Sequence, residues 1–218
     1  GKIRAIAKKI LKDPDQINIA LSKPAEGVIQ GVYILHDTQK MPLLRIILNG
    51  RDIKSILIFS STKEKVKQLE MELKRLKYNV SAIHSDLEQI QRKAVLRSFS
   101  NRELQILVAT DILSRGIDID NIGLVINYDV PGDAEDYIHR VGRTARADTK
   151  GEAITLVGPN DQRKLMQIEE LIEGEINRLQ VPEELGEVPA YEPKLRRNSG
   201  NFHRGGKKTF QRRSGPRR

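Results

Sequence analysis

One short segment of the sequence concentrates fixed positive charge. The string YIHRVGRTAR, residues 137–146, contains one histidine, three arginines and no acidic residue: His139, Arg140, Arg143 and Arg146. An arginine is permanently charged and carries a planar fork of donors that matches the oxygens of a phosphate. Gly142 beside the last two arginines would let a ligand or another backbone come close. The segment is therefore a candidate phosphate site, and its alternative interpretation is a solvated helix face.

The first part of this segment has the spacing of an amphipathic helix. After Asp133, a residue that can cap a helix, apolar residues recur at helical intervals at Ala134, Tyr137, Ile138 and Val141. We expect the helix to stop at Gly142 and to point His139 and Arg140 away from the core. An exposed ion pair between Asp136 and Arg140 would account for that one arginine. Arg143 and Arg146 have no acidic residue four positions upstream.

Composition limits the class of protein. The chain has 218 residues, 38% of them apolar, which is enough for one domain and a tail. We find no apolar run that could cross a bilayer and no signal-peptide pattern, so we expect a cytoplasmic protein without a membrane partner. The absence of cysteine excludes disulfides and thiolate metal sites, and the four histidines are far apart in sequence. No metal site is expected.

Basic charge is concentrated at the carboxyl terminus. The net charge is +9, and residues 194–218 contain ten Lys or Arg and no Asp or Glu, so the rest of the chain is close to neutral. A segment this polar cannot offset the entropy of folding, and we expect it to be disordered. A flexible basic arm suits nucleic acid, and Phe202 and Phe210 could stack on bases. The alternative is an appended solubilising tail.

Strand-like and helix-like segments alternate along the chain. Strands are expected at 28–35, 56–59, 80–83, 106–109, 124–127 and 153–157, and helices at 2–11, 39–48, 63–77, 87–99, 134–141 and 161–173. Short apolar runs such as SILIFS and IGLVIN are typical of strands that are buried on both faces. Helices between such strands form the crossovers of a parallel sheet. The sequence therefore predicts an α/β, doubly wound domain.

Three segments that follow strands could bind an anion. Ser60, Ser61 and Thr62 begin a long helix, where free N–H groups attract anions, although simple N-capping would explain one hydroxyl. Thr110 ends another strand, before the string DILSRGIDID with its Arg115–Gly116 pair and Asp118. The arginine helix is the third segment. Because ligands bind at the carboxyl ends of parallel strands, we expect all three on one edge of the sheet.

Four strings together resemble a known family. SILIFSST, HSDLEQIQR, VATDILSRGIDI and YIHRVGRTAR have the order and approximate spacing of motifs in the second RecA-like domain of DEAD-box ATP-dependent RNA helicases. The resemblance covers residues 1 to about 175, and the short body with a basic Gly-rich tail is similar to the bacterial RhlE-type subgroup. It implies a RecA-like, mostly parallel sheet flanked by helices. It divides the chain into a linker helix (1–22), the helicase domain (23–180) and a disordered basic tail (181–218).

The resemblance also implies roles for individual residues. Arg143 and Arg146 would reach the γ-phosphate of ATP as an arginine finger, and Asp118 would contact the ribose. His139 and Arg140 would bond the partner domain and couple the nucleotide state to RNA binding. The remaining matched positions would line the path of the RNA backbone, contacting phosphates and 2′-hydroxyls: Thr62, Gln89, Arg92, Thr110 and Gly116.

The chain departs from the family pattern at two positions. Ser85 stands where the family commonly has Gly, which puts in doubt a close approach of that backbone to RNA. Ala145 replaces a frequent Gly between the two arginines, a small change that an ordinary loop conformation tolerates.

The sequence contains neither a phosphate loop nor a D-E-A-D string. The GGKKT of the tail has neither the spacing nor the strand–helix context of a phosphate loop. The adenine and phosphate contacts and the Mg²⁺ ligands are therefore expected in a first RecA-like domain that precedes Gly1. On this interpretation the cofactor is ATP with Mg²⁺, the partners are RNA and that first domain, and the chain alone is inactive.

Two alternatives belong to other functional classes. The chain could be a stand-alone RNA-binding protein that kept the fold and lost catalysis, but such a protein has no use for intact γ-phosphate arginines. It could also derive from a DNA helicase of the same superfamily, which the DEAD-box form of all four strings disfavours.

Overall fold

The computed structural model describes residues 27–110, 119, 121–144 and 151–193. Within these ranges seven strands form one sheet in the order β3-β4-β2-β5-β6-β1-β7. Every pairing is parallel. The strands are β1 (Val28–Ile34), β2 (Ile56–Phe59), β3 (Val80–Ile83), β4 (Ile106–Ala109), β5 (Leu124–Asn127), β6 (Gly151–Val157) and β7 (Asn177–Arg178). The predicted α/β class with a parallel sheet is confirmed.

Helices connect the strands, as the alternating pattern predicted. They are α2 (Lys40–Leu48), α3 (Lys63–Arg75), α4 (Gln89–Ser100), α6 (Ala134–Val141) and α7 (Gln162–Ile172), with short 3-10 turns η1 (Asp37–Gln39) and η2 (Glu183–Leu185). Their ends differ from the predicted ends by at most a few residues. The helix predicted at 2–11 lies outside the described residues.

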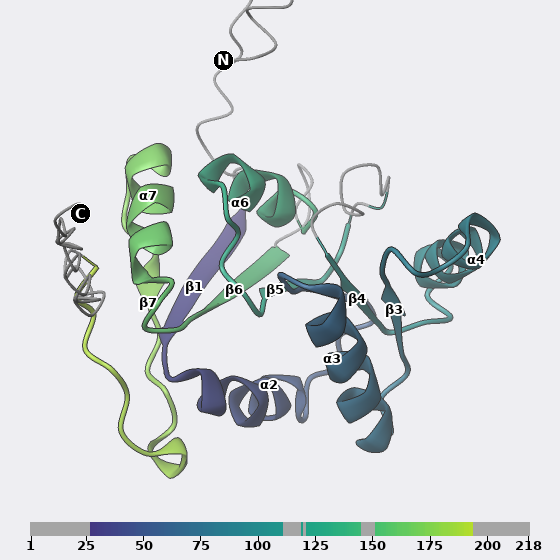
Figure 1. Ribbon diagram of the computed structural model, residues 1–218, viewed down its shortest axis with the longest axis horizontal. Helices are drawn as coiled ribbons and strands as arrows, with labels where there is room; N and C mark the ends of the chain where they lie inside the picture. Colours follow the sequence, from purple (N-terminus) through teal and green to yellow (C-terminus); the bar gives the residue numbers. More distant parts are fainter. Residues whose placement is uncertain (1–26, 111–118, 120, 145–150, 194–218) are drawn as a thin grey trace, which may run out of the picture.

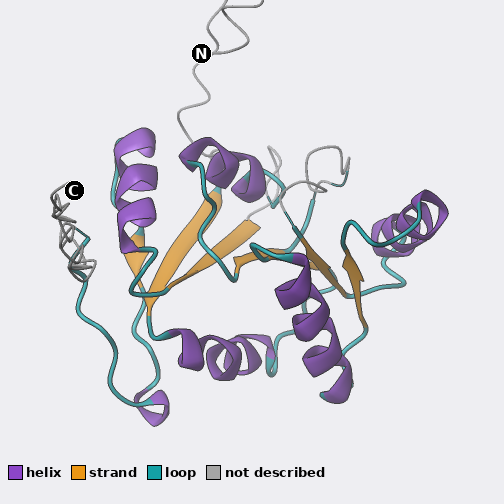
Figure 2. Cartoon of the chain, in the orientation of Figure 1, coloured by secondary structure: helices purple, strands orange, loops and turns teal. Residues whose placement is uncertain are grey.

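The helices cover both faces of the sheet (Figures 1 and 2). One core contains side chains from α6 and α7, such as Tyr137 and Leu165, together with Phe99 of α4. The other contains side chains from α2 and α3, such as Leu44 and Leu69. All residues of the central strands β2, β4 and β5 are buried. Burial on both faces explains why these strands have continuous apolar runs rather than alternating ones.

The ordered body continues beyond the boundary predicted at residue 180. The short strand β7 pairs with β1, and the chain then returns along the domain to Pro193. Two buried glutamines hold this return: the Gln39 amide donates to the carbonyls of Leu185 (2.8 Å) and Glu187 (2.9 Å). The Gln162 amide donates to the Ala190 carbonyl (2.7 Å). Peptide groups satisfied by buried side chains allow a segment of low apolar content to pack.

The prediction of a disordered tail concerns residues that lie partly outside the described ranges. Residues 194–218 are among those left undescribed, so the disorder of the basic tail stays a prediction. No described helix combines the length and apolar character needed to cross a membrane.

We predict that Gly151→Ala will destabilise the domain. A Cβ at this position would overlap the backbone carbonyl and the side-chain hydroxyl of Thr144, and backbone atoms cannot move aside as the end of a flexible side chain can. Overpacking of this kind costs about 1–3 kcal/mol of unfolding free energy. Urea unfolding will measure the loss.

Gly132→Ala is the matched control. A Cβ there meets nothing within 4 Å, so the change should stay within about 0.5 kcal/mol. Equal effects of the two substitutions would contradict the packing of β6 against the segment that carries Arg143.

Candidate functional site

Helix α6 forms where the arginine segment predicted it. Asp133 caps its start by accepting a hydrogen bond from the Glu135 amide (3.1 Å), and Gly142 follows its last residue. Tyr137, Ile138 and Val141 are buried, and His139 is exposed, as expected.

Arg140 does not point into solvent, and this prediction is wrong. Arg140 is only 2% exposed. Its Nη1 donates to Asn127 Oδ1 and to the Asp129 carbonyl, both at 2.9 Å. The guanidinium also lies over the Phe59 ring, 4.9 Å from the centroid. The buried arc of α6 is thus wider than its apolar stripe. Hydrogen bonds and a cation–π contact are what allow a permanently charged group to be buried there.

The end of α6, with Arg143 after it, lies at the opposite edge of the sheet from Ser60, Ser61, Thr62 and Thr110. The Arg143 carbonyl accepts from the Ile122 amide (3.1 Å), and the Thr144 hydroxyl donates to the Ile122 carbonyl (2.6 Å). Ile122 precedes β5, so Arg143 lies near the amino ends of the strands. The expectation of one shared edge is therefore wrong. The physical reason is length: α6 runs back along β5, and eight helical residues span about 12 Å, close to the length of a four-residue strand.

Three residues with predicted roles lie outside the described ranges: Asp118, Arg146 and Gly116. Of the predicted nucleotide contacts, the structure therefore describes Arg143, which is half-buried beside the exposed Gly142.

The predicted RNA-binding residues within the described ranges follow three neighbouring strands. Thr62 follows β2, Thr110 follows β4, and Gln89 and Arg92 begin the helix after β3. Because the sheet order is β3-β4-β2, their segments are adjacent at the carboxyl edge. Thr62 and Gln89 are exposed, and Thr110 is half-buried. The structure thus places these four positions along one edge, and their contact with RNA stays a prediction.

Two of these positions also have local structural roles. Thr62 caps α3, its hydroxyl accepting from the Lys65 amide (3.2 Å), so N-capping does explain one hydroxyl. Arg92 donates through Nη2 to the Ser85 carbonyl (3.1 Å). The Ser85 side chain is exposed. The backbone carbonyl of Ser85, which stands where the family commonly has Gly, therefore orients Arg92.

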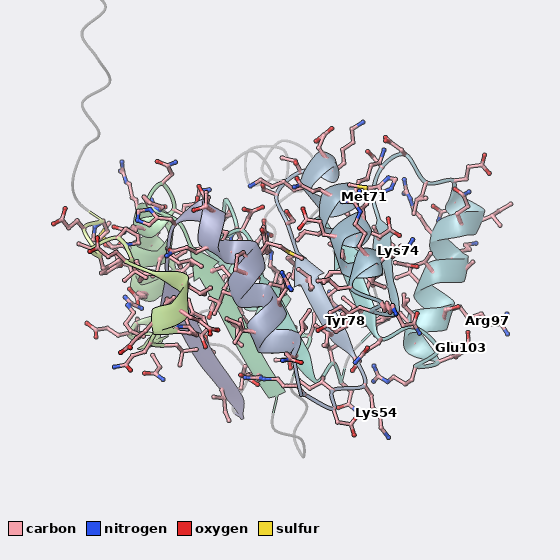
Figure 3. The ribbon with its side chains drawn as sticks, turned by 90° about the horizontal axis from the view of Figure 1, so that it is seen from below. Lys54, Met71, Lys74, Tyr78, Arg97 and Glu103 are labelled. Atoms are coloured by element: carbon pink, nitrogen blue, oxygen red, sulfur yellow. The ribbon has the colours of Figure 1, made fainter. Side chains whose placement is uncertain are left out.

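Asp86 joins the segment after β3 to helix α3. Its carboxylate pairs with Lys63 (3.1 Å) and Lys67 (2.6 Å). Hydrogen bonds from Lys67 and Lys63 lower the pKa of the Asp86 carboxyl below its ordinary value. Figure 3 shows α4 at the outer edge of the domain, with Arg97 near its far end, and Lys74 on α3. The two ion pairs of Asp86 with Lys63 and Lys67 fix the segment that carries Ser85 against α3.

A buried carboxylate lies at the same edge, and sequence reasoning missed it. Asp129 Oδ2 accepts from the Ser60 hydroxyl (2.8 Å), the Ser61 amide (2.9 Å) and the Ser61 hydroxyl (2.9 Å). Two of the three hydroxyls that we considered as anion ligands are thus directed at a carboxylate of the same chain. This cluster joins the segment after β2 to the segment after β5.

Two lysines complete the surroundings of Asp129. Lys65 lies 2.8 Å from Oδ1 and the buried Lys40 lies 3.5 Å away; Lys40 also pairs with Asp37 (3.0 Å). Burial raises the pKa of the Asp129 carboxyl, but the hydrogen bonds from Lys65, Ser61 and Ser60 outweigh burial, and the pKa lies below its ordinary value. Asp129 is therefore charged at neutral pH. It could have been found by the rule used for the other loops, because it follows the end of β5 by two residues.

Comparisons with known proteins agree with this architecture. A model of the helicase conserved C-terminal domain matches residues 39–148. The chain is 35% identical over 181 residues to the DEAD-box ATP-dependent RNA helicase RhpA of Helicobacter pylori, covering 83% of this chain and 37% of the relative. It is 39% identical over 181 residues to the ATP-dependent RNA helicase DbpA of Bacillus subtilis, covering 83% and 38%.

Solved structures of DEAD-box proteins share the fold. Escherichia coli SrmB, solved bound to the regulator of ribonuclease activity A, superposes with a TM-score of 0.67 at 30% identity, over 81% of this chain and 99% of the other. Saccharomyces cerevisiae Dbp5, solved bound to RNA and ADP BeF3, gives 0.74 at 30% identity, over 82% and 48%. The chain is the helicase C-terminal domain of a DEAD-box protein. Its sheet is accordingly of the predicted RecA-like type.

The DEAD-box domain spans well under half of its curated relatives, 37% of RhpA and 38% of DbpA. Activities carried by the relatives' remaining residues are therefore not shown by this domain. Its predicted membership of the RhlE-type subgroup also stays a prediction.

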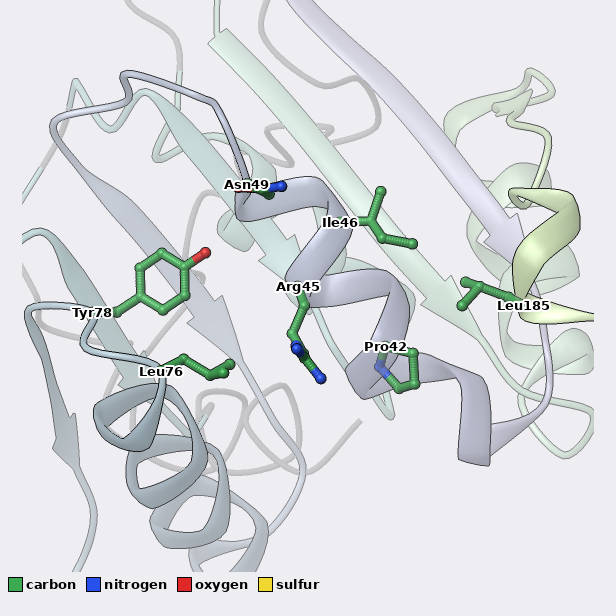
Figure 4. A pocket seen from close by; sticks show the side chains of 7 residues that line it. All are labelled: Pro42, Arg45, Ile46, Asn49, Leu76, Tyr78 and Leu185. Carbon is green, nitrogen blue, oxygen red and sulfur yellow. The ribbon is translucent and has the colours of Figure 1, made fainter.

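A groove lies between α2 and the segment that joins α3 to β3 (Figure 4). It is lined by Pro42, Arg45, Ile46, Asn49, Leu76, Tyr78 and Leu185. None of the residues with predicted roles lines this groove.

We predict that Asp129 makes the domain sensitive to acid. Because its pKa in the folded state lies below the ordinary value of 3.8, the ionised carboxyl stabilises the fold above that pH. This contribution is lost as the pH falls below 3.8 towards the folded-state pKa. Urea unfolding at pH 7, 5 and 3 should show the largest loss between pH 5 and 3.

Asp129→Asn isolates this contribution from those of other carboxyls. The variant should be less stable than the natural domain at pH 7, and the difference between the two proteins should narrow at pH 3. A difference that stays constant from pH 7 to pH 3 would contradict the charged state of Asp129.

Proposed function

We propose that this domain is the carboxyl-terminal half of an ATP-dependent RNA helicase, which couples ATP binding and hydrolysis to RNA binding and local duplex unwinding. The observation that carries the proposal is the separation of two sets of side chains on a DEAD-box fold. Hydroxyls and an arginine lie along the carboxyl edge after β2, β4 and β3, and Arg143 lies near the amino ends of the strands. One domain can therefore contact RNA and nucleotide at separate places.

Arg143 and Arg146 are proposed to act at the γ-phosphate and Asp118 at the ribose. The position of Arg143 suits this role, since two main-chain hydrogen bonds, to Arg140 and from Ile122, fix its backbone beside an exposed glycine. A guanidinium carried by a fixed backbone could stabilise the charge on a transferring phosphoryl group with little reorganisation of the chain. The phosphate loop, the adenine contacts and the Mg²⁺ ligands would come from a first RecA-like domain of the same protein.

The carboxyl edge is proposed to contact the RNA backbone. Thr62, Gln89, Arg92, Thr110 and Gly116 would bond phosphates and 2′-hydroxyls, and such contacts do not read base identity. In support, Dbp5, solved bound to RNA and ADP BeF3, has a similar fold. The basic residues after 193 would add electrostatic affinity. The location that we propose for this function is the cytoplasm.

His139 and Arg140 are proposed to couple the nucleotide state to RNA binding. His139 is exposed on α6 and could touch a first domain. Arg140, 2% exposed, would act from inside this domain, through the contacts that it makes with Asn127 and Asp129.

We predict that ATP turnover requires both domains and both arginines. The 218-residue chain alone should release no phosphate from ATP with saturating single-stranded RNA, whereas the chain joined to its first RecA-like domain should. In the joined protein, Arg143→Ala or Arg146→Ala should lower turnover on the order of 10³-fold. Lysine at either position should rescue poorly, because an ammonium lacks the planar fork.

Arg163→Ala, on the exposed surface of α7, is the control and should keep normal turnover. The assignment fails if the Arg143 and Arg146 variants lower the melting temperature but turn over ATP normally per folded molecule. Turnover by the chain alone that is lost on changing Arg146 would overturn the proposal of a half-enzyme.

We predict that the basic tail dominates RNA affinity of the isolated chain. Each phosphate contact to single-stranded RNA adds about −0.7 to the slope of log affinity against log salt concentration. Deleting residues 194–218 should therefore flatten the slope, and a tail of equal length with Gln at every Lys and Arg should do the same. Equal slopes with and without the tail would show that the folded domain does the binding.

A further inference from the structure

Asp129 takes part in the contacts that connect the carboxyl edge of the sheet with the arginine-bearing helix. Its side chain accepts three hydrogen bonds from Ser60 and Ser61, directly before Thr62. Its main-chain carbonyl accepts from Arg140, three residues before Arg143. A single buried residue thus contacts both the segment proposed to touch RNA and the helix proposed to present the nucleotide arginines.

Arg140 spans the distance between the two edges. Side chains of a helix lean towards its amino terminus, so the Arg140 guanidinium reaches back to Asn127 and Asp129 at the carboxyl end of β5. Its backbone meanwhile belongs to the last turn of α6, where the Arg140 carbonyl accepts from the Arg143 amide (3.2 Å). A displacement of the Arg140 guanidinium would therefore displace the last turn of α6, and a displacement of that turn would move the guanidinium.

The surroundings make this connection stiff. Asp129 is 4% exposed, and its carboxylate is held by two lysines as well as by the two serines. The Arg140 guanidinium is fixed between Asn127, Asp129 and the Phe59 ring. Phe59, Ser60 and Ser61 are consecutive, so one short segment contacts both members of the pair. Buried groups with this many specific partners cannot move independently.

We propose that Asp129 is a positioning residue that couples RNA binding at the segment after β2 to the placement of the nucleotide arginines through Arg140. The inference rests on the proposed function and adds the residue through which its two sites communicate. Asp129 itself touches neither RNA nor nucleotide. Its removal should therefore lower the mutual effect of the two ligands more than the affinity for either one alone.

The test uses the chain joined to its first RecA-like domain. The dissociation constant for a single-stranded RNA is measured with and without a non-hydrolysable ATP analogue, and the ratio of the two constants gives the coupling. Coupled sites typically change each other's affinity about 5- to 150-fold, which is the effect expected for the natural protein. Asp129→Asn should bring the ratio to about 2-fold or less, with each separate affinity changed by less than about 3-fold.

A second variant covers the possibility that Asp129→Asn does not fold. Replacing both Ser60 and Ser61 by Ala keeps the carboxylate and its lysines and cuts the hydroxyl bonds to the segment before Thr62. This variant should also lower the coupling ratio, to a smaller extent because the Ser61 amide bond remains.

Glu169→Gln is the matched control. Glu169 likewise accepts from a backbone amide, a hydroxyl and a basic side chain, those of Ile176, Tyr191 and Arg178, but it contacts neither the segment after β2 nor Arg140 among the described residues. It should lose stability and keep the natural coupling ratio. Circular dichroism confirms that each variant is folded.

The outcomes separate two kinds of failure. A natural protein without coupling would contradict the proposed function. A natural protein with coupling, and folded Asp129 or serine variants that retain it, would overturn the role of Asp129 alone. Parallel losses of both separate affinities with an unchanged ratio would show that Asp129 is only structural.

Discussion

The buried contact between Arg140 and Asp129 constrains much of the arrangement around it. A guanidinium that cannot lose its charge lies in the interior, held by an amide oxygen, a carbonyl and an aromatic ring. This contact fixes α6 against β5, and with it the point at which the chain leaves the helix at Gly142. The Asp129 carboxylate fixes the segment after β2 in the same way. Neither segment could be moved without leaving a buried charge short of partners, which is costly.

Parallel topology explains why the two proposed functional regions lie at opposite edges of one domain. Each strand delivers the following loop to the carboxyl edge, and each crossover helix must return the chain to the amino edge. Short crossovers such as α6 therefore present one end at each edge. Residues early in the connection, such as Thr62 at the start of α3, join the proposed RNA path. Residues late in it, such as Arg143, join the other region.

The segment after β7 shows how a polar stretch becomes part of the body. Gln39 and Gln162 begin connections that follow the adjacent strands β1 and β6, and each uses its side-chain amide to hold the returning backbone. Glu169 adds a salt bridge to Arg178 and a hydrogen bond from Tyr191. These contacts fix where the chain stands at Pro193, from which the basic residues continue. The basic residues that we propose to add affinity for RNA therefore follow a defined place on the domain.

The sequence by itself determined the fold class, most element boundaries and the position of Thr62 and Thr110 after strand ends, because apolar periodicity and strand-end position are local properties. It also indicated the family, through four strings whose spacing matches. It could not determine that Arg140 is buried, since an exposed i, i+4 pair with Asp136 fitted the same spacing. Nor did it show that Asp129 is buried, because the partners of its carboxylate are 64 to 89 residues away in the chain. Only the tertiary structure decided which charged groups lie inside and which edge Arg143 reaches, because burial and pairing depend on contacts between distant segments that no local pattern encodes.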